Sequence, residues 1–209
     1  MNDLAAIVFI VDDDPSVLKA LTRLISFAGL NVVTFASPQE FLDSHDQNAP
    51  GCLVLDVAMP HINGLELQQA LAASGSELPL IFLTAHGDIP MSVRAIKQGA
   101  VDFLTKPVHD SDLIEVIHGA IKKNRIARQA RLKLIDLQQR LATLTPRERE
   151  VLSHVVSGKR NRKIADELGT AEQTIKIHRA SLMKKLKAES LAELLKLAER
   201  LGIMASPLD

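Results

Sequence analysis

The 209-residue chain contains no tryptophan, no tyrosine and one cysteine. The shortage of aromatic rings disfavours recognition of single-stranded nucleic acid by base stacking. The single cysteine, Cys52, excludes a disulfide framework and a metal site built on several cysteines. No segment approaches the roughly 18 apolar residues that span a bilayer, and the start of the chain lacks the features of a signal peptide. We therefore expect a cytoplasmic protein with no membrane partner.

The chain also has no net charge, because 25 Lys and Arg balance 25 Asp and Glu. This balance conceals two halves of opposite sign. Residues 1–119 hold 5 of the basic and 15 of the acidic side chains, and residues 120–209 hold the other 20 basic and 10 acidic ones. A basic C-terminal half suits the phosphates of DNA, whereas the acidic half needs an interpretation of its own.

Short runs of Val, Ile and Leu alternate with helix-patterned segments in the acidic half. They predict five strands, at residues 7–11, 31–35, 52–55, 80–84 and 101–104. The runs are continuously apolar and the connections are long enough for crossover helices, so the sheet should be parallel and covered on both faces. The pattern predicts a doubly wound α/β domain, in which ligands bind at the carboxyl ends of the strands.

Polar residues stand at those strand ends. Asp12 and Asp13 follow the first strand, Asp56 and Thr84 end the third and fourth, and Lys106 follows the fifth. Carboxylates that converge repel one another unless a hard cation such as Mg²⁺ lies between them. One carboxylate could then attack phosphorus while an ammonium and a hydroxyl hold the phosphoryl oxygens. Each residue alone could be a cap, a turn, a loop or an ordinary strand residue, so the prediction rests on all of them meeting at one edge.

Three stretches resemble the receiver domain of two-component response regulators, most closely those of the FixJ type. They are VDDD at 11–14, LDVAMPHINGLEL at 55–67 and TAHGDIPMSVRAIKQGAVDFLTKP at 84–107. The resemblance implies a flavodoxin-like five-stranded fold with strand order 2-1-3-4-5 and Asp56 as the phosphoacceptor. It also implies a Mg²⁺ ion held by Asp12, Asp13, Asp56 and the backbone carbonyl of Ala58.

The same resemblance assigns further roles. Thr84 would be the switch hydroxyl, Lys106 the phosphate-binding ammonium and Phe103 the aromatic switch residue, with a cis bond before Pro107. A sensor histidine kinase would donate the phosphoryl group, and phosphorylation would favour a homodimer through residues 89–98 and 101–104. The receiver would not be an enzyme beyond assisting its own phosphotransfer and slow autodephosphorylation.

A helical pattern runs from Ile114 to Thr143, with no Gly or Pro after Gly119. Its apolar residues at 127, 130, 134, 137, 141 and 144 have the spacing of a coiled-coil seam. The run is under three heptads, so a coiled coil between two copies and a helix packed on its own receiver domain remain alternatives. We assign residues 1–122 to the receiver, 123–142 to a linker helix and 143–209 to a DNA-binding domain.

Three capping-box patterns mark helix starts in the C-terminal region, at Thr145, Thr170 and Ser190. They predict helices at about 146–157, 171–187 and 191–201, with a short helix at 161–168. This is a small all-α domain of four helices. The helices at 161–168 and 171–187 have the spacing of a helix-turn-helix. The basic helix at 171–187 would enter the major groove of double-stranded DNA. On charge alone, the alternative is that the basic face of this helix is simply exposed to solvent and does not bind DNA.

The motifs TPRE, NRKIA and TIKIHR, all within residues 144–190, resemble the LuxR-type helix-turn-helix of NarL/FixJ regulators. This resemblance implies two sets of DNA contacts. The residues facing bases would be Glu172, Thr174, Lys176, Ile177 and Ala180. The residues contacting phosphates would be Asn161, Lys163, His178, Arg179 and Lys184.

We therefore expect a response regulator that accepts a phosphoryl group on Asp56 and binds DNA as a dimer to regulate transcription. RNA polymerase is a further candidate partner. One alternative is a DNA-binding regulator whose receiver is a phosphorylation-independent dimerisation module. A phosphohydrolase with an aspartyl nucleophile is disfavoured, because Asp56-Val-Ala lacks a second acid two residues on.

Overall fold

The computed structural model describes residues 5–46, 49–85 and 87–203. It divides into two compact units, Met1–Arg128 and Gln129–Asp209. The first unit contains a five-stranded sheet with its helices, and the second is helical. Among the described helices, none is both long enough and apolar enough to cross a membrane.

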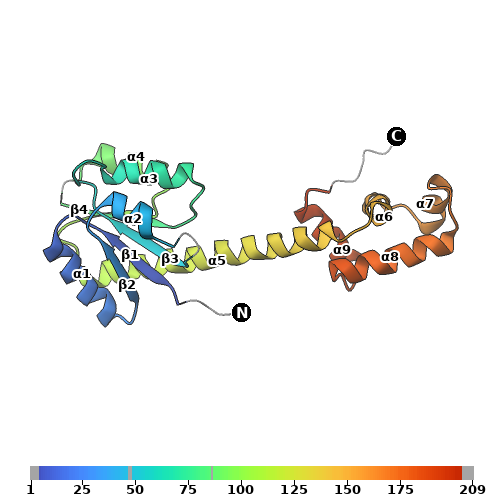
Figure 1. Ribbon diagram of the computed structural model, residues 1–209, viewed down its shortest axis with the longest axis horizontal. Coiled ribbons are helices and arrows are strands. Elements are labelled where there is room, and N and C mark those ends of the chain that lie inside the picture. The colour runs from blue at the N-terminus through green and yellow to red at the C-terminus, as the bar shows by residue number, and fades with distance from the viewer. Residues whose placement is uncertain (1–4, 47–48, 86, 204–209) are drawn as a thin grey trace. The chain divides into compact units, whose positions relative to one another are not determined.

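The first unit alternates strands and helices (Figure 1). Its elements are β1 (Ile7–Val11), α1 (Pro15–Phe27), β2 (Asn31–Phe35), α2 (Pro38–Ser44), β3 (Gly51–Leu55), α3 (Gly64–Ala73), β4 (Leu80–Thr84), α4 (Ile89–Lys97), β5 (Asp102–Thr105) and the first part of α5 (Asp110–Ala142). All strand pairs are parallel, in the order β2-β1-β3-β4-β5. The predicted flavodoxin-like topology is confirmed, with strand bounds that agree to within one residue.

Helices cover both faces of this sheet (Figure 1). One apolar cluster joins the strands to α1 and α5, and the other joins them to α2, α3 and α4. Strands β3 and β4 are buried along their whole length, which explains their unbroken apolar sequence. Burial raises the pKa of the Cys52 thiol to about 12, so this cysteine stays protonated and unreactive at neutral pH.

The helices that follow β1 and β3 on the carboxyl side of the sheet both begin at side-chain caps. Asp14 caps α1 by accepting from the Ser16 amide, and Asn63 caps α3 in a capping box with Glu66. Helix α3 begins so close to β3 that a Cβ on Gly64 would lie 2.3 Å from the Asp56 carbonyl oxygen. Glycine is therefore required here, and the close approach helps to fix the backbone at Asp56.

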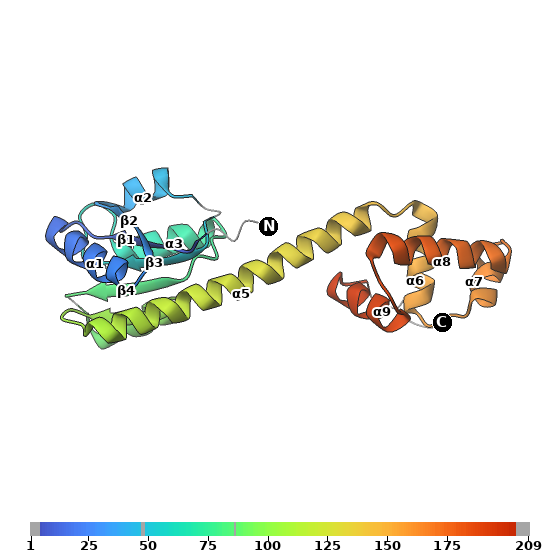
Figure 2. The ribbon, with the colours of Figure 1, turned by 90° about the horizontal axis from the view of Figure 1, so that it is seen from below.

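Helix α5 is one uninterrupted helix of 33 residues (Figure 2). Leu113, Ile117 and Ala120 are fully buried and pack in the α1 and α5 cluster of the first unit. The helix then continues into the second unit, so the predicted linker helix is an extension of the receiver's last helix. The boundary assigned from the sequence at residue 122 falls inside α5, and the one at residue 142 falls at its end. The division into domains stays a prediction.

Part of the predicted coiled-coil seam is buried within the second unit. Leu137 and Leu144 are buried, and Leu141 packs against the helical core of that unit. Only Ala127, Ala130 and Leu134 of the seam are exposed. The C-terminal half of the seam therefore has a partner within this chain.

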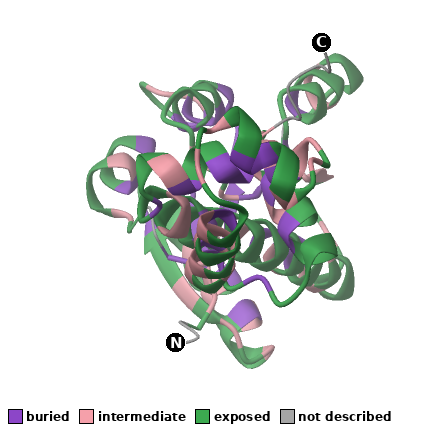
Figure 3. Ribbon diagram, turned by 90° about the vertical axis from the view of Figure 1, so that its right-hand side faces the viewer, coloured by how far each residue is buried: buried purple, intermediate pink, exposed green. Residues whose placement is uncertain are grey.

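The second unit contains the end of α5 and four further helices, and Figure 3 colours the chain by how far each residue is buried. These are α6 (Pro146–Val156), α7 (Asn161–Glu167), α8 (Glu172–Leu186) and α9 (Leu191–Arg200). Each has buried residues on one side and exposed residues on the other, and the buried ones form a single core. The four predicted helices are confirmed, and α7 and α8 form a helix-turn-helix.

Of the three predicted capping boxes, the one at Thr145 is complete and the one at Ser190 is present only as an N-cap. Thr145 forms a capping box with Glu148, and the Ser190 hydroxyl accepts from the Glu193 amide. The box predicted at Thr170 is wrong, because α8 begins after Ala171 and has no side-chain cap. The Thr170 amide instead bonds to the Ala165 carbonyl, so this residue belongs to the end of α7.

Candidate functional site

Two buried carboxylates and one ammonium meet at the carboxyl ends of β1, β3 and β5. The Lys106 Nζ donates to Asp12 Oδ2 at 2.7 Å and to Asp56 Oδ1 at 3.3 Å. Asp12 follows β1 and is 3% exposed, while Asp56 follows β3 and is 7% exposed. The structure thus brings together three residues that lie far apart in the sequence, as predicted from the strand ends.

The second oxygen of each carboxylate is held by the backbone. Asp12 Oδ1 accepts from the Asp14 amide at 2.9 Å, and Asp56 Oδ2 accepts from the Ala58 amide at 2.8 Å. Burial lowers the pKa of Lys106, but the hydrogen bonds and negative charges of Asp12 and Asp56 outweigh it, so the net pKa is raised. Lys106 is therefore a cation at neutral pH, and both acids are fixed in orientation.

Thr84 and Phe103 lie on the neighbouring strands. Thr84 ends β4, is fully buried, and its carbonyl accepts from the Lys106 amide at 2.8 Å. The peptide bond between Lys106 and Pro107 is cis, as predicted. The half-buried ring of Phe103 packs on Phe82 with a centroid separation of 5.7 Å. Both predicted switch residues thus lie on the strands next to the acidic cluster.

The donor set fits Mg²⁺, although it is smaller than predicted. Asp13 is exposed, and no group of three or more His, Cys, Asp or Glu in the described ranges could hold a metal ion. Three converging carboxylates were expected, and the structure brings two together. Mg²⁺ commonly binds through one or two carboxylates and keeps several waters, so Asp12 and Asp56 with a nearby backbone carbonyl are sufficient. Lys106 supplies the positive charge that these two acids require without a metal.

The predicted DNA contacts lie on α7 and α8. Ile175, Leu182 and Leu186 point into the core of the second unit, which leaves the opposite side of α8 open to solvent. Six of the predicted contacts are exposed: Lys163, Glu172, Lys176, Ile177, Ala180 and Lys184. Four are half-buried: Asn161, Thr174, His178 and Arg179. All ten therefore have some exposed surface.

Two pairs of these residues contact each other. The Arg179 guanidinium donates to Asn161 Oδ1 at 2.8 Å, which ties α8 to α7. Lys176 and Glu172 form an exposed ion pair at 3.3 Å along α8. The first contact sets the relative position of the two helices of the motif, and the second is too exposed to contribute much to stability.

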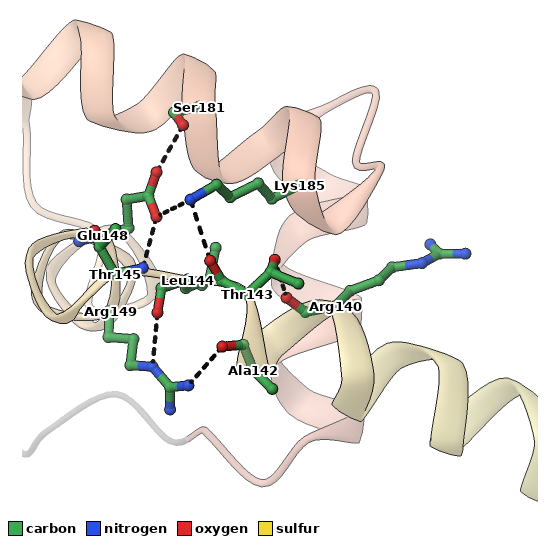
Figure 4. A network of polar contacts seen from close by, with 9 residues as sticks. All are labelled: Arg140, Ala142, Thr143, Leu144, Thr145, Glu148, Arg149, Ser181 and Lys185. Carbon is green, nitrogen blue, oxygen red and sulfur yellow. Dashed lines mark hydrogen bonds and ion pairs between the residues drawn. The ribbon is translucent and has the colours of Figure 1, made fainter.

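Sequence reasoning missed a buried network next to α8 (Figure 4). Glu148 is 4% exposed and accepts from Ser181 Oγ and from Lys185 Nζ, each at 2.6 Å. The sequence places Glu148 in the capping box with Thr145, which predicts contacts within the first turn of the helix. The partners on α8 lie 33 and 37 residues further along the chain, beyond the reach of a local motif.

Comparison with known families accounts for both units. The family "Response regulator receiver domain" matches residues 8–118, and "Bacterial regulatory proteins, luxR family" matches residues 142–198. The chain belongs to the two-component response regulators with a LuxR-type DNA-binding domain. This response regulator acts in the regulation of transcription through a two-component system.

Relatives of this response regulator are similar over most of their length. Nodulation protein W of Bradyrhizobium diazoefficiens is 46% identical over 96% of this chain and 88% of that protein. Transcriptional regulatory protein FixJ of the same organism is 39% identical over 94% of this chain and 96% of that protein. The solved structure of response regulator StyR is 45% identical, with a TM-score of 0.88, and covers 94% of this chain and 99% of that one.

Proposed function

We propose that a sensor histidine kinase transfers a phosphoryl group to Asp56. The observation that carries this proposal is the Asp12, Lys106 and Asp56 cluster at the carboxyl edge of the sheet. Asp56 is oriented by the Ala58 amide, which leaves its other oxygen beside the Lys106 ammonium. A nucleophile next to a fixed cation suits attack on phosphorus, because the cation offsets the charge of the incoming group.

Mg²⁺ would be held by Asp12, Asp56 and the carbonyl of Ala58, with the exposed Asp13 next to Asp12 as a further ligand, and it would neutralise the phosphoryl oxygens. The residues of the chain supply the other functions. Lys106 would bind a phosphoryl oxygen, and the Thr84 hydroxyl would hold another. Phe103 would change its packing when Thr84 moves. The chain would not be an enzyme in any wider sense, because its own acceptor group is modified.

The phosphorylated protein would dimerise through α4 and β5 and would bind the major groove with α8. Ile89, Val93 and Ile96 are exposed apolar residues on α4, and their spacing places them on one side of the helix. On α8, exposed Lys176, Ile177 and neighbouring residues would reach base edges. We also propose that the protein works in the cytoplasm, where the chromosome lies, and that RNA polymerase is a partner at the promoter.

Labelling with radioactive acetyl phosphate tests the acceptor site. The wild-type chain should be labelled in the presence of Mg²⁺ and should lose most of that labelling in EDTA. Asp56→Asn should abolish labelling, because an amide cannot attack phosphorus. Asp43→Asn, which changes an exposed aspartate on α2, is the matched control and should be labelled like wild type. Undiminished labelling of the Asp56 variant would refute the assignment.

A further inference from the structure

The C-terminal ends of α5 and α8 are joined by two reciprocal contacts. Lys185 Nζ on α8 donates to the Thr143 carbonyl at 3.1 Å, just after α5 ends. Arg140 Nη1 in the last turn of α5 donates to the carbonyl of Leu186, the last residue of α8, at 3.4 Å. Each cation therefore satisfies a carbonyl at the end of the other helix, where carbonyls lack partners within the helix.

These contacts also have an electrostatic basis. The C-terminal ends of two helices each carry partial negative charge, so bringing them together is unfavourable unless a cation lies nearby. Arg140 and Lys185 provide that charge. Leu141 and Leu144 pack in the same apolar core as Leu182, so the end of α5 and the recognition helix share packing as well.

Glu148 fixes Lys185 in this position (Figure 4). Glu148 Oε2 accepts from Lys185 Nζ at 2.6 Å and from the Thr145 amide at 2.8 Å. Its other oxygen accepts from Ser181 Oγ at 2.6 Å, which adds a second contact to α8. The bonds from Lys185 and Ser181 outweigh burial and lower the pKa of Glu148 to about 2, so it is ionised at neutral pH.

Arg149 extends the network to the residues that follow α5. Its Nε donates to the Leu144 carbonyl at 3.3 Å and its Nη2 to the Ala142 carbonyl at 3.5 Å. The connection between α5 and α6 is therefore held by cations from α6 and α8 at three successive carbonyls, those of Ala142, Thr143 and Leu144. A change at the end of α5 would disturb contacts to α8 directly.

We propose that Lys185 is a positioning residue that couples the recognition helix to the end of α5, so that a signal from the receiver changes DNA affinity through this contact. Helix α5 begins in the receiver unit and ends at this contact without a break, which supplies the physical connection. Lys185 is outside the predicted DNA contacts and is occupied by Glu148 and Thr143. This inference rests on the proposed phosphorylation of Asp56.

The test compares DNA affinity with and without acetyl phosphate in the full chain. The DNA is a duplex selected from a random-sequence pool with the phosphorylated wild-type protein. For coupling of ordinary strength, the wild-type gain in affinity should be about 5- to 150-fold. Lys185→Met should reduce this gain to near onefold while Asp56 is still labelled. Lys185→Arg should restore the gain, because its guanidinium can still reach Glu148 and the Thr143 carbonyl.

Controls separate coupling from folding and from DNA contact. Lys196→Met changes an exposed lysine on α9 and should keep the full gain. Arg140→Gln removes the reciprocal contact from the α5 side and should also reduce the gain, so the proposal stays testable if Lys185→Met fails to fold. A full gain in both Lys185→Met and Arg140→Gln would overturn the proposal. Equal loss of affinity in both phosphorylation states would also overturn it, whereas a wild-type protein without any gain would refute the proposed function itself.

Discussion

At the scale of single residues, Lys106 is the cation that allows two buried acids to lie side by side. Its ammonium contacts both Asp12 and Asp56, and its raised pKa keeps it charged throughout the neutral range. Because a raised lysine pKa adds stability below its ordinary value near 10.5, this contribution is complete at pH 7 and is lost only at strongly basic pH.

Lys106→Met should lower the free energy of unfolding at pH 7 by about 1–3 kcal/mol, because two buried carboxylates lose a charged hydrogen-bond donor. Urea denaturation at pH 7 measures this effect. Lys19→Met, which changes an exposed lysine on α1, should stay within about 0.5 kcal/mol of wild type. A Lys106→Met protein as stable as wild type at pH 7 would contradict this account.

A second prediction for a single residue concerns Glu148 and the pH dependence of the free energy of unfolding. Since its pKa falls from 4.5 unfolded to about 2 folded, its contribution to stability is present above about 4.5 and is lost as the pH falls towards 2. Glu148→Gln should therefore lower the free energy of unfolding by about 1–3 kcal/mol at pH 7 and by clearly less at pH 3. Denaturant titrations at the two pH values measure the difference.

The matched control for that experiment is Glu150→Gln on the same helix. Glu150 forms an exposed ion pair with Arg147, so its replacement should change stability by less than about 1 kcal/mol at either pH. A stability gap between wild type and Glu148→Gln that is the same at pH 3 and pH 7 would show that the ion pair with Lys185 is not the source of the effect.

At the scale of elements, α8 presents an apolar side chain to solvent where DNA is expected. Ile177 is 61% exposed, so Ile177→Ala should leave stability within about 0.5 kcal/mol of wild type. Its affinity for the selected duplex should nevertheless fall, since an apolar contact to a base would be lost. Fluorescence anisotropy measures the affinity, and thermal unfolding checks the fold.

Ile126 on α5 is a close match for this comparison, because it is 59% exposed and also lies on a helix. Ile126→Ala should bind DNA like wild type. If Ile177→Ala binds DNA as well as Ile126→Ala does, then α8 does not read bases through this residue.

The same elements show how far the sequence could predict the structure. Apolar runs in β3 and β4 were sufficient to place the strands, because parallel strands buried on both faces leave a continuous signal. The cap of α8 was predicted one residue too early, at Thr170, whereas the N-cap is Ala171 and the Thr170 amide bonds to the end of α7. The continuity of α5 across both units could be predicted only as a helical pattern, because periodicity alone does not say which core each turn packs against.

The cluster of Asp12, Asp56 and Lys106 could be predicted from the sequence, whereas the contacts of Glu148 with α8 could not. Asp12, Asp56 and Lys106 could be predicted to meet, because strand order brings the carboxyl ends of β1, β3 and β5 to one edge. The pairing of Glu148 with Lys185 depends on how α6 packs against α8, and no local pattern encodes that packing. Asp13 is exposed next to the buried Asp12, and its role as a metal ligand stays a prediction.

At the scale of the whole molecule, the net charge of zero is the sum of an acidic N-terminal half and a basic C-terminal half. The acidic half contains the cluster of Asp12, Asp56 and Lys106, and the basic half contains the end of α5 and the helix-turn-helix. The two units share one helix, α5, so a change in the receiver and a change in DNA binding can be linked within a single element. We propose that phosphorylation of Asp56 controls the affinity of α8 for DNA.

The most direct test measures the affinity of the full chain for the selected duplex, with and without acetyl phosphate and Mg²⁺, in wild type and in Asp56→Asn. We predict a gain of about 5- to 150-fold for wild type and no gain for Asp56→Asn, whose unphosphorylated affinity should equal that of wild type. An equal gain in both proteins, or no gain in wild type, would show that phosphorylation of Asp56 does not control DNA binding.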